Sequence, residues 1–293
     1  MTPRQALAGA VAAGVERLDA QLLLLQALGR AQSDRAWLLA HDDEEFGGQV
    51  ERDYRQLLRR RAGGEPLAYL VGSKEFFGLR LLVDKRVLVP RPETETLVEW
   101  ALQVLAGHFA PDPGSTASSI AGRAPNDKPS VLDLGTGSGA VALAVKHSRP
   151  DASVEAVDAS TDALAVAAAN AKALGLDIAL RQASWLTGTA GRYDLIVSNP
   201  PYVAARDPHL AALAHEPRAA LAAGPDGLDD IRAIASQAAI HLEPGGWLLL
   251  EHGWDQARAV RGLLAAAGLS RVGSRRDLAG IERCSGGQRL ELG

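Results

Sequence analysis

The chain has 293 residues, of which 47% are hydrophobic and 23% charged, proportions typical of a globular protein large enough for a full core and a smaller second unit. The formal net charge is −4 and the sequence pI about 6.0, which argues against the basic surface of a nucleic-acid-binding protein. Cys284 is the only cysteine, so an internal disulfide and a multi-cysteine metal site are excluded.

The apolar stretch at residues 6–15 consists mainly of alanine, glycine and valine, and Glu16 and Arg17 follow it directly. It is too weakly hydrophobic for a secretion signal, and no apolar run approaches the length of a membrane span. We therefore expect a cytoplasmic protein with no membrane partner.

Residues 1–72 have a helical pattern. Leu18, Leu22 and Leu25 recur at i, i+4 and i+7, which predicts one face of a helix that stops near Gly29. Ser33 is a plausible N-cap for a second short helix that runs through Trp37 to Ala40.

A third helix is expected over residues 50–61 and ends in Arg59-Arg60-Arg61, where positive charge suits a helix C-terminus. We interpret this run as a solvated helix end, and contact with an anionic partner is the alternative. Pro66 can begin a further short helix. Residues 1–72 contain no catalytic constellation, so this small bundle is expected to recognise a substrate.

The segments Phe76-Phe77-Gly78-Leu79 and Leu81 to Val89 are expected to be two strands around a turn. Pro90-Arg-Pro-Glu-Thr-Glu95 follows them. Residues 73–95 are therefore predicted to form a hairpin linker between two domains.

The remaining residues, 96–293, are predicted to form an α/β domain. A helix is expected from about Thr96 to Ala106, and the Pro, Gly, Ser and Ala composition of residues 109–129 predicts a flexible surface loop. From Ser130 the pattern alternates strand and helix at intervals typical of a doubly wound sheet.

The first strand of this domain, residues 131–134, leads directly into a glycine-rich turn. Glycines let the backbone approach a ligand closely, and the N-terminus of the following helix favours electronegative groups. The residues expected to contact a cofactor in this turn are Gly135, Thr136, Gly137, Ser138 and Gly139.

The next strand ends at Asp158, whose carboxylate can accept two hydrogen bonds from a ribose diol. Together with the turn, this acid predicts nucleotide-type binding; the alternative is a tight turn with an acidic helix cap. The G-x-G-x-G spacing, rather than G-x-G-x-x-G, favours S-adenosyl-L-methionine over a dinucleotide. Trp185, at a third strand end, is a candidate to stack on adenine, although a plain core tryptophan explains it nearly as well.

Asp194-Leu-Ile-Val-Ser-Asn-Pro-Pro-Tyr202 is the most informative stretch of the chain. Proline fixes its own φ and lacks an N–H, so the strand ends in a stiff extended segment lined by acceptors. The Asn199 side-chain oxygen and the Pro200 carbonyl suit the two hydrogens of a planar NH₂ group, and Tyr202 is expected to form a flat wall. An ordinary strand-to-loop turn is the alternative.

The chain resembles the family of peptide chain release factor glutamine methyltransferases over its whole length, apart from the loop near residues 109–129. Two of the shared segments occur in other amino-group methyltransferases as well, whereas the Pro-Arg-Pro-Glu-Thr-Glu and Glu-Pro-Arg segments are more specific. The segments that carry the resemblance are residues 87–95, 133–139, 198–202, 216–221 and 224–228.

This resemblance implies a Rossmann-like class I S-adenosyl-L-methionine-dependent methyltransferase domain, with the last strand of its doubly wound sheet antiparallel. It implies that the glycine turn, Asp158, Trp185 and Asn199 contact the cofactor. It also implies that Asn199, Pro200, Pro201 and Tyr202 hold the glutamine of a Gly-Gly-Gln loop in a release factor. The product would be N5-methylglutamine, with Asn199, Pro200 and Tyr202 as the catalytic group.

Two other functions use the same features. N6-adenine methylation of DNA or RNA needs similar acceptors for an exocyclic NH₂ group, but the acidic pI counts against it. A non-catalytic nucleotide-binding module is the second alternative. The seven histidines show no ligand spacing, so no metal is expected.

Several residues remain without an assigned role at this level. An exposed salt bridge, a helix cap or the active-site rim explains Glu93, Glu95, Glu216 and Arg218 equally well. Towards the end of the chain, Gly286-Gly287-Gln288 repeats the substrate tripeptide, and we interpret it as a strand-entry turn. Cys284 is expected to be a buried small hydrophobe.

Overall fold

The computed structural model describes residues 1–107 and 128–290, which divide into two compact units. The first comprises Met1–Ser73 and Val83–Lys85, and the second comprises Lys74–Leu82 and Arg86–Gly293. Residues 109–127 of the expected loop lie outside the described residues. No helix in the described part of the chain is long and apolar enough to cross a membrane.

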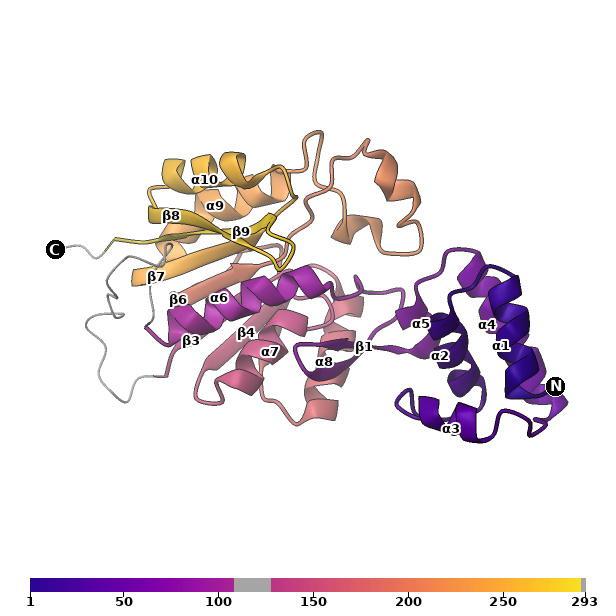
Figure 1. Ribbon diagram of the computed structural model, residues 1–293. Helices are drawn as coiled ribbons and strands as arrows, with labels where there is room; N and C mark the ends of the chain where they lie inside the picture. The colour runs from indigo at the N-terminus through magenta and orange to yellow at the C-terminus, as the bar shows by residue number, and fades with distance from the viewer. Residues whose placement is uncertain (108–127, 291–293) are drawn as a thin grey trace. The chain divides into compact units, whose positions relative to one another are not determined.

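The first unit is helical, as predicted, and has its own core (Figure 1). Leu23, Leu24, Leu38 and Tyr54 are among its fully buried side chains, and the Tyr54 hydroxyl donates to the carbonyl of Ala20. The helices are α1 (Pro3–Ala12), α2 (Arg17–Ala27), α3 (Arg35–Ala40), α4 (Gly48–Ala62) and α5 (Leu67–Val71).

The predicted inner face of α2 is wrong by part of a turn. Leu25 is fully buried as predicted, but Leu18 is 46% exposed, and Ala20, Leu23 and Leu24, which were not predicted, are fully buried. Four consecutive leucines at 22–25 fit several helical registers equally well, so spacing alone cannot select the buried one.

The cap predicted for α3 is also wrong, because Asp34 and not Ser33 holds the N-cap position. The basic end of α4 forms ion pairs: Arg60 with Glu65, and Arg61 with Asp19 at 2.6 Å. These pairs favour the interpretation of the arginine run as a solvated helix end.

The hairpin consists of β1 (Ser73–Phe76) and β2 (Leu79–Leu82). Phe77 and Gly78 connect them with φ of 50° and 75°, the left-handed conformation of a two-residue hairpin turn. The Glu95 carboxylate accepts from the Phe77 amide at 3.0 Å, which gives one of the unassigned acids a structural role. The prediction of these strands is therefore wrong in detail: Phe77 and Gly78 form the turn instead of lying in the first strand, and the second strand ends at Leu82 rather than Val89.

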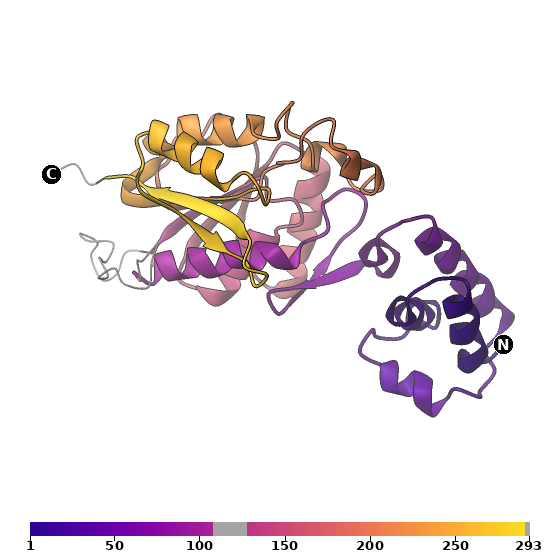
Figure 2. The same ribbon diagram turned by 45° about the horizontal axis from the view of Figure 1, so that its top comes forward.

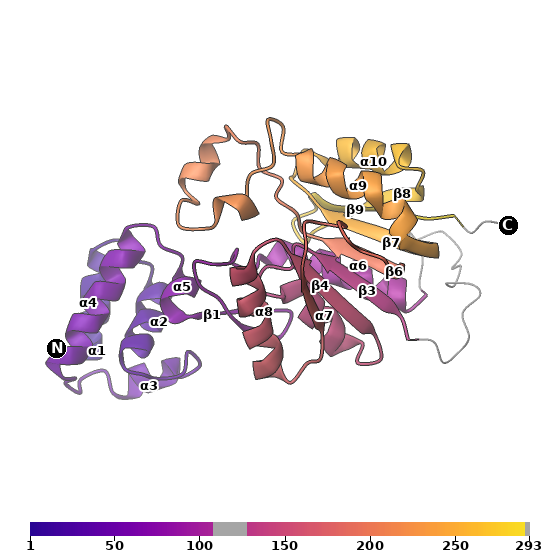
Figure 3. The ribbon, with the colours of Figure 1, turned by 180° about the vertical axis from the view of Figure 1, so that it is seen from behind.

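The second unit is built on a seven-stranded sheet of order β5-β4-β3-β6-β7-β9-β8, seen in Figures 1 and 3. Strands β3 to β7 are parallel, and β9 runs antiparallel between β7 and β8, which confirms the predicted doubly wound sheet with an antiparallel last strand. The strands are β3 (Ser130–Leu134), β4 (Ser153–Asp158), β5 (Ala179–Gln182), β6 (Tyr193–Ser198), β7 (Leu242–Glu251), β8 (Ser270–Arg276) and β9 (Glu282–Gln288).

Helices cover both faces of the sheet, because alternate side chains of the buried strands point to opposite sides. Val131 and Leu195 pack with α6, α7 and α8, whereas Leu132 and Ile196 pack with α9 and α10. Figure 2 shows α6 and the α9–α10 pair on opposite sides of the strands. The helices are α6 (Glu95–Leu105), α7 (Ala140–Ser148), α8 (Thr161–Leu174), α9 (Asp229–His241), α10 (Ala257–Ala266) and the short 3₁₀ turns Pro92–Thr94, Pro208–Ala211 and Arg218–Ala220.

The Gly286-Gly287-Gln288 tripeptide lies inside β9, so its prediction as a strand-entry turn is wrong. A Cβ at Gly286 would lie 2.5 Å from Leu249 Cδ2 and 2.9 Å from the Leu248 carbonyl oxygen. The Gln288 side chain donates to the Gly245 carbonyl at 2.8 Å. Close packing against β7 therefore accounts for these glycines. Cys284 is fully buried, as predicted.

This packing predicts that Gly286→Ala destabilises the protein by about 1–3 kcal/mol, because the added methyl group overpacks the contact with β7. Gly262→Ala in α10 is the matched control, since a Cβ there meets no atom within 4 Å and alanine favours a helix. Urea unfolding of both variants measures the difference. Equal stability of the two would contradict the packing argument.

Candidate active site

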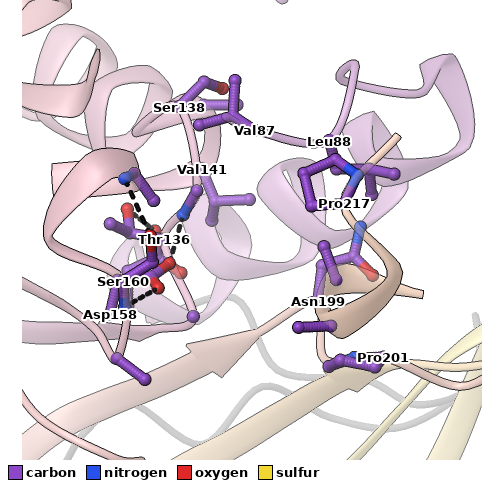
Figure 4. A pocket seen from close by; sticks show the side chains of 18 of the residues that line it. Val87, Leu88, Thr136, Ser138, Val141, Asp158, Ser160, Asn199, Pro201 and Pro217 are labelled. Carbon is purple, nitrogen blue, oxygen red and sulfur yellow. Dashed lines mark hydrogen bonds between the residues drawn. The ribbon is translucent and has the colours of Figure 1, made fainter. Parts of the chain in front are cut away.

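A cavity of about 410 Å³ opens at the C-terminal ends of β3, β4 and β6. The strand order reverses at β3, and ligands of open α/β sheets bind at such a switch point. Figure 4 shows Asp158 on one side of this cavity and Asn199 on the other. Sequence prediction had assigned both residues to one site, and both line this cavity.

The glycine turn forms the floor of the cavity between β3 and α7. Gly135, Gly137 and Gly139 have φ of 69°, 55° and 84°, a region that favours glycine. The amides of Gly135 and Thr136 donate to the Val157 carbonyl, which fixes the turn to β4. A Cβ at Gly137 would meet no atom within 4 Å, so this part of the turn borders open space.

Asp133, at the end of β3, holds the glycine turn through hydrogen bonds to its carboxylate. Its Oδ2 accepts from the Thr136 hydroxyl at 2.7 Å and from the Ala142 amide at 3.2 Å. Burial raises the pKa of this carboxyl to about 6, while the two hydrogen bonds oppose the rise. Asp133 was not predicted as a site residue, although its position just before the glycine turn could have indicated a role in holding that turn.

Asp158 is the acid expected to bind a ribose. Its Oδ2 accepts from the Gly137 amide and its Oδ1 from the Ser160 amide, both at 2.9 Å. Each carboxylate oxygen has a second lone pair, so both remain able to accept a hydroxyl hydrogen. The two amides hold the carboxylate in a fixed orientation at the cavity wall (Figure 4).

Trp185 lines the same cavity and lies directly over the turn. A Cβ at Gly135 would be 3.0 Å from Cζ3 of its ring, so only glycine permits this approach. The backbone of Trp185 has φ of 51°, which is strained for a bulky residue. Burial raises the pKa of Asp230, another residue of the cavity wall, and the nearby Trp185 side chain opposes the rise. The strained backbone favours a ligand-binding role over plain core packing.

Asn199 lies at the opposite wall, directly after β6. Its Nδ2 donates to the Thr94 hydroxyl at 3.1 Å. Its Oδ1 is buried and has no hydrogen-bond partner among the described residues. A buried acceptor without a partner costs stability, so its presence points to a ligand that donates a hydrogen bond.

The residues after Asn199 divide between two environments. Pro201 lines the cavity, whereas Pro200 and Tyr202 are not among the described residues that line it. The Tyr202 hydroxyl donates to Glu251 at 3.3 Å, and its ring packs with the core on the α9 side of the sheet. This placement differs from the expected flat wall of the substrate site.

Thr94, Tyr202 and Glu251 form a buried polar group behind Asn199. Glu251 is fully buried; its Oε1 accepts from the Tyr202 hydroxyl, and its Oε2 has no hydrogen-bond partner among the described residues. Burial raises the pKa of Glu251 to about 7, and burial also raises the pKa of Tyr202. Neither Thr94 nor Glu251 was predicted as a site residue. Thr94 could have been found from its place in the Pro-Arg-Pro-Glu-Thr-Glu segment, and Glu251 from its place at the end of a buried strand.

The acid Glu216 joins two specific sequence segments at the rim of the cavity. Its carboxylate pairs with Arg91 and accepts from the Val89 amide at 3.0 Å. Its side chain is only 2% exposed, so this pair is an internal support rather than a surface salt bridge. Arg218 reaches the Ala205 carbonyl at 3.4 Å.

The described residues contain no group of three or more His, Cys, Asp or Glu side chains arranged to hold a metal ion. His252, after β7, is buried and bonded through its two ring nitrogens to the Gly253 carbonyl and the Ser285 hydroxyl. It is a structural residue at a strand end.

Solved structures with a similar fold are methyltransferases. A methyltransferase from Pyrococcus furiosus has a TM-score of 0.50 and 17% identity, over 82% of this chain and 98% of that one. The catalytic domain of hMettl16 in complex with MAT2A 3′UTR hairpin 6 has a TM-score of 0.54 and 14% identity, over 83% of this chain and 82% of that one. At these identities the likeness concerns the fold.

Proteins found by sequence similarity are much more similar to this chain than these solved structures are. The family models for the PrmC N-terminal domain and the methyltransferase small domain match residues 4–72 and 104–224. A release factor glutamine methyltransferase of Bordetella pertussis is 49% identical over 94% of this chain and 95% of its own length. One from Xylella fastidiosa is 46% identical over 97% of each chain, and one from Pseudomonas aeruginosa is 43% identical over 93% and 92%. The chain belongs to the family of release factor glutamine methyltransferases.

Proposed function

We propose that this protein transfers a methyl group from S-adenosyl-L-methionine to the side-chain amide nitrogen of the glutamine in the Gly-Gly-Gln motif of a peptide chain release factor, giving N5-methylglutamine. The observation that carries the proposal is the buried, unpartnered Oδ1 of Asn199 at the wall of the cavity. A carboxamide NH₂ is the donor that such an oxygen lacks. Release factors act in translation, so a cytoplasmic location belongs to the same proposal.

The residues around the glycine turn fit S-adenosyl-L-methionine, which supplies an electrophilic methyl group on a sulfonium centre. Asp158 presents two fixed acceptors for the ribose hydroxyls. The open space over Gly137 and the amide-rich turn suit the amino-acid end, and Trp185 offers a ring face for the adenine.

The acceptors of the Asn199 segment would hold the substrate amide. We assign one of its hydrogens to Asn199 Oδ1 and the other to the Pro200 carbonyl, whose direction the two prolines restrict. Asn199 lies in a rigid position because β6 is fully buried on both faces and Nδ2 is bonded to Thr94.

A carboxamide nitrogen is a poor nucleophile because its lone pair is delocalised into the carbonyl. Position and alignment are therefore the main contributions of the chain. Acceptors at both N–H groups also stabilise the positive charge that develops on nitrogen. The methylated nitrogen is then acidic enough to lose a proton to water, and no strong base is needed.

The first unit is assigned to recognition of the release factor. It folds around its own apolar core and carries no residue of the cavity wall. The two other functions that the sequence left open, N6-adenine methylation and a non-catalytic nucleotide-binding module, are supported by none of the close relatives and are not proposed.

The recognition role predicts that removal of residues 1–72 weakens methylation of an intact release factor while S-adenosyl-L-methionine binding survives. The control substrate is a short Gly-Gly-Gln peptide, because it offers nothing for the first unit to bind. Its rate should change little in the truncated protein. Full efficiency of the truncated protein on the intact factor would refute the recognition role.

The ribose assignment predicts that Asp158→Ala weakens S-adenosyl-L-methionine binding about ten- to a hundredfold, since loss of a charged acceptor costs about 1.5–3 kcal/mol. Asp158→Asn retains one acceptor and should lose less. Calorimetric titration measures both affinities, and thermal melting verifies that each variant is folded. Unchanged affinity in the alanine variant would remove Asp158 from the cofactor site.

The substrate assignment predicts that Asn199→Ala lowers the methyl-transfer rate constant about 10²–10³-fold, the loss typical of one preorganised polar partner. Asn199→Asp keeps an acceptor and should retain more activity than alanine but less than the parent. Single-turnover transfer to a release factor at saturating cofactor separates chemistry from cofactor binding. An alanine variant within about threefold of the parent, ~0.7 kcal/mol, would make Asn199 only a turn residue.

A further inference from the structure

We propose that Asn170 is a positioning residue that joins the cofactor turn to the end of the β1–β2 hairpin, so that a cofactor bound at the turn also holds the hairpin end in place. The inference rests on the cofactor part of the proposed function, because the turn needs an occupant. Asn170 lies in α8, is fully buried and is not among the described residues that line the cavity. It therefore acts through the backbone that it holds.

The Asn170 side chain binds the hairpin through two hydrogen bonds to a single residue. Its Oδ1 accepts from the Leu82 amide at 2.6 Å, and its Nδ2 donates to the Leu82 carbonyl at 3.0 Å. The side-chain amide thus pairs with the last residue of β2 as the backbone of a neighbouring strand would. This pairing joins two residues that are 88 positions apart in the chain.

The same amide holds the cofactor turn. Its Nδ2 donates another hydrogen bond, at 2.8 Å, to the carbonyl of Ser138, a residue that lines the cavity (Figure 4). One helical turn before Asn170, Ala167 comes so close to the cofactor turn that a Cβ at Gly139 would be 3.3 Å from its own Cβ. Residues three positions apart share a helix face, so this face of α8 packs directly against the turn.

The groups around Asn170 determine the orientation of its amide. The nitrogen makes two hydrogen bonds to carbonyls, and the oxygen accepts one from an N–H group. Rotation of the amide by half a turn would place its oxygen against the two carbonyls and its NH₂ group against the N–H, and both contacts are repulsive. The amide therefore has one stable orientation, which holds the Leu82 backbone and the Ser138 carbonyl together.

Packing alone does not call for an amide at this position. An amide placed in the core loses its hydrogen bonds to water, and only internal hydrogen bonds offset that cost. The other buried residues of α8 are Ala163, Val166, Ala167 and Ala171, so an apolar residue at position 170 would complete an apolar face. The two backbone segments that the amide joins are the reason for its presence.

The end of β2 also leads towards the cavity along the chain. The strand ends at Leu82, and a few residues later Arg86, Val87 and Leu88 line the cavity wall. Asn170 thus restrains the cofactor turn and, in addition, the chain shortly before it reaches this wall.

This link makes the turn and the hairpin end energetically dependent on each other. A ligand at the turn restricts the motion of Ser138, and a restrained Ser138 carbonyl restricts the amide that holds Leu82. Coupling between two sites is reciprocal, so a hairpin end held by Asn170 also favours cofactor binding. Leu82 is not among the described residues that line the cavity, so a response of its backbone amide to the cofactor reports on this link.

Hydrogen exchange of the Leu82 amide, followed by NMR in the parent protein, tests the link without any substitution. Saturating S-adenosyl-L-methionine should slow this exchange about 3- to 30-fold, because the acceptor of this amide is Asn170 Oδ1. The matched control is the Gly78 amide, which donates to the Glu75 carboxylate in the same hairpin and should exchange equally fast with and without cofactor. An unchanged Leu82 rate, or equal slowing at Gly78, would overturn the proposal.

The second test measures cofactor affinity by calorimetric titration. Asn170→Ala removes all three hydrogen bonds and should weaken S-adenosyl-L-methionine binding about 3- to 30-fold, the range expected for a residue that couples two sites without touching the ligand. Asp194→Ala is the matched control for reduced stability. The buried Asp194 side chain also accepts from a backbone amide, that of Ser130 at 2.7 Å, but at the edge of the sheet opposite the cavity. Its affinity for the cofactor should match that of the parent.

Urea unfolding verifies that both variants are folded under the conditions of the titration. Parent affinity in Asn170→Ala, or an equal loss of affinity in both variants, would overturn the proposal. The exchange measurement needs no variant and decides the question if Asn170→Ala does not fold. Both measurements concern the cofactor alone, so a parent that binds it but does not methylate a release factor would overturn the proposed function and not this link.

Discussion

The active site depends on one hydrogen-bond acceptor that the folded chain leaves without a partner. Asn199 Oδ1 is buried, and the only group that holds its side chain among the described residues is Thr94, on the nitrogen side. By contrast, both oxygens of Asp158 and the carboxylate of Glu216 already receive a backbone or side-chain donor. An oxygen without a partner fits the proposed substrate, whose amide NH₂ group can donate a hydrogen bond to it.

The parallel sheet makes this arrangement rigid. Strands β3, β4, β6 and β7 end at the same edge, so the glycine turn, Asp158, Asn199 and Glu251 lie on neighbouring strand ends although they are far apart in the chain. Apolar packing on both faces, by α6 to α8 on one side and α9 and α10 on the other, fixes the strands against one another. Position, which is the main catalytic requirement of a weak nucleophile, follows from the core.

Buried acids support the binding residues from behind. Asp133 accepts from Thr136 in the glycine turn, Glu216 pairs with Arg91 at the rim, and Glu251 accepts from the Tyr202 hydroxyl. Each is almost fully buried, and burial raises the pKa of Asp133 and Glu251 towards neutral pH. The geometry of the site therefore depends on the ionisation of these acids. A support made only of apolar side chains would avoid the desolvation cost of burying a charge.

The sequence by itself determined the fold class and predicted that the glycine turn, Asp158 and Asn199 share one site, because glycine spacing, proline stiffness and strand hydrophobicity are local properties. It misplaced the inner face of α2 and placed Gly286-Gly287-Gln288 in a turn, since buried registers and close strand contacts are set by distant partners. Only the tertiary structure turned Tyr202 towards Glu251 and brought Thr94 to the amide nitrogen of Asn199. Which polar groups form hydrogen bonds with one another depends on which strand ends meet, and that is decided by the packing of the whole sheet.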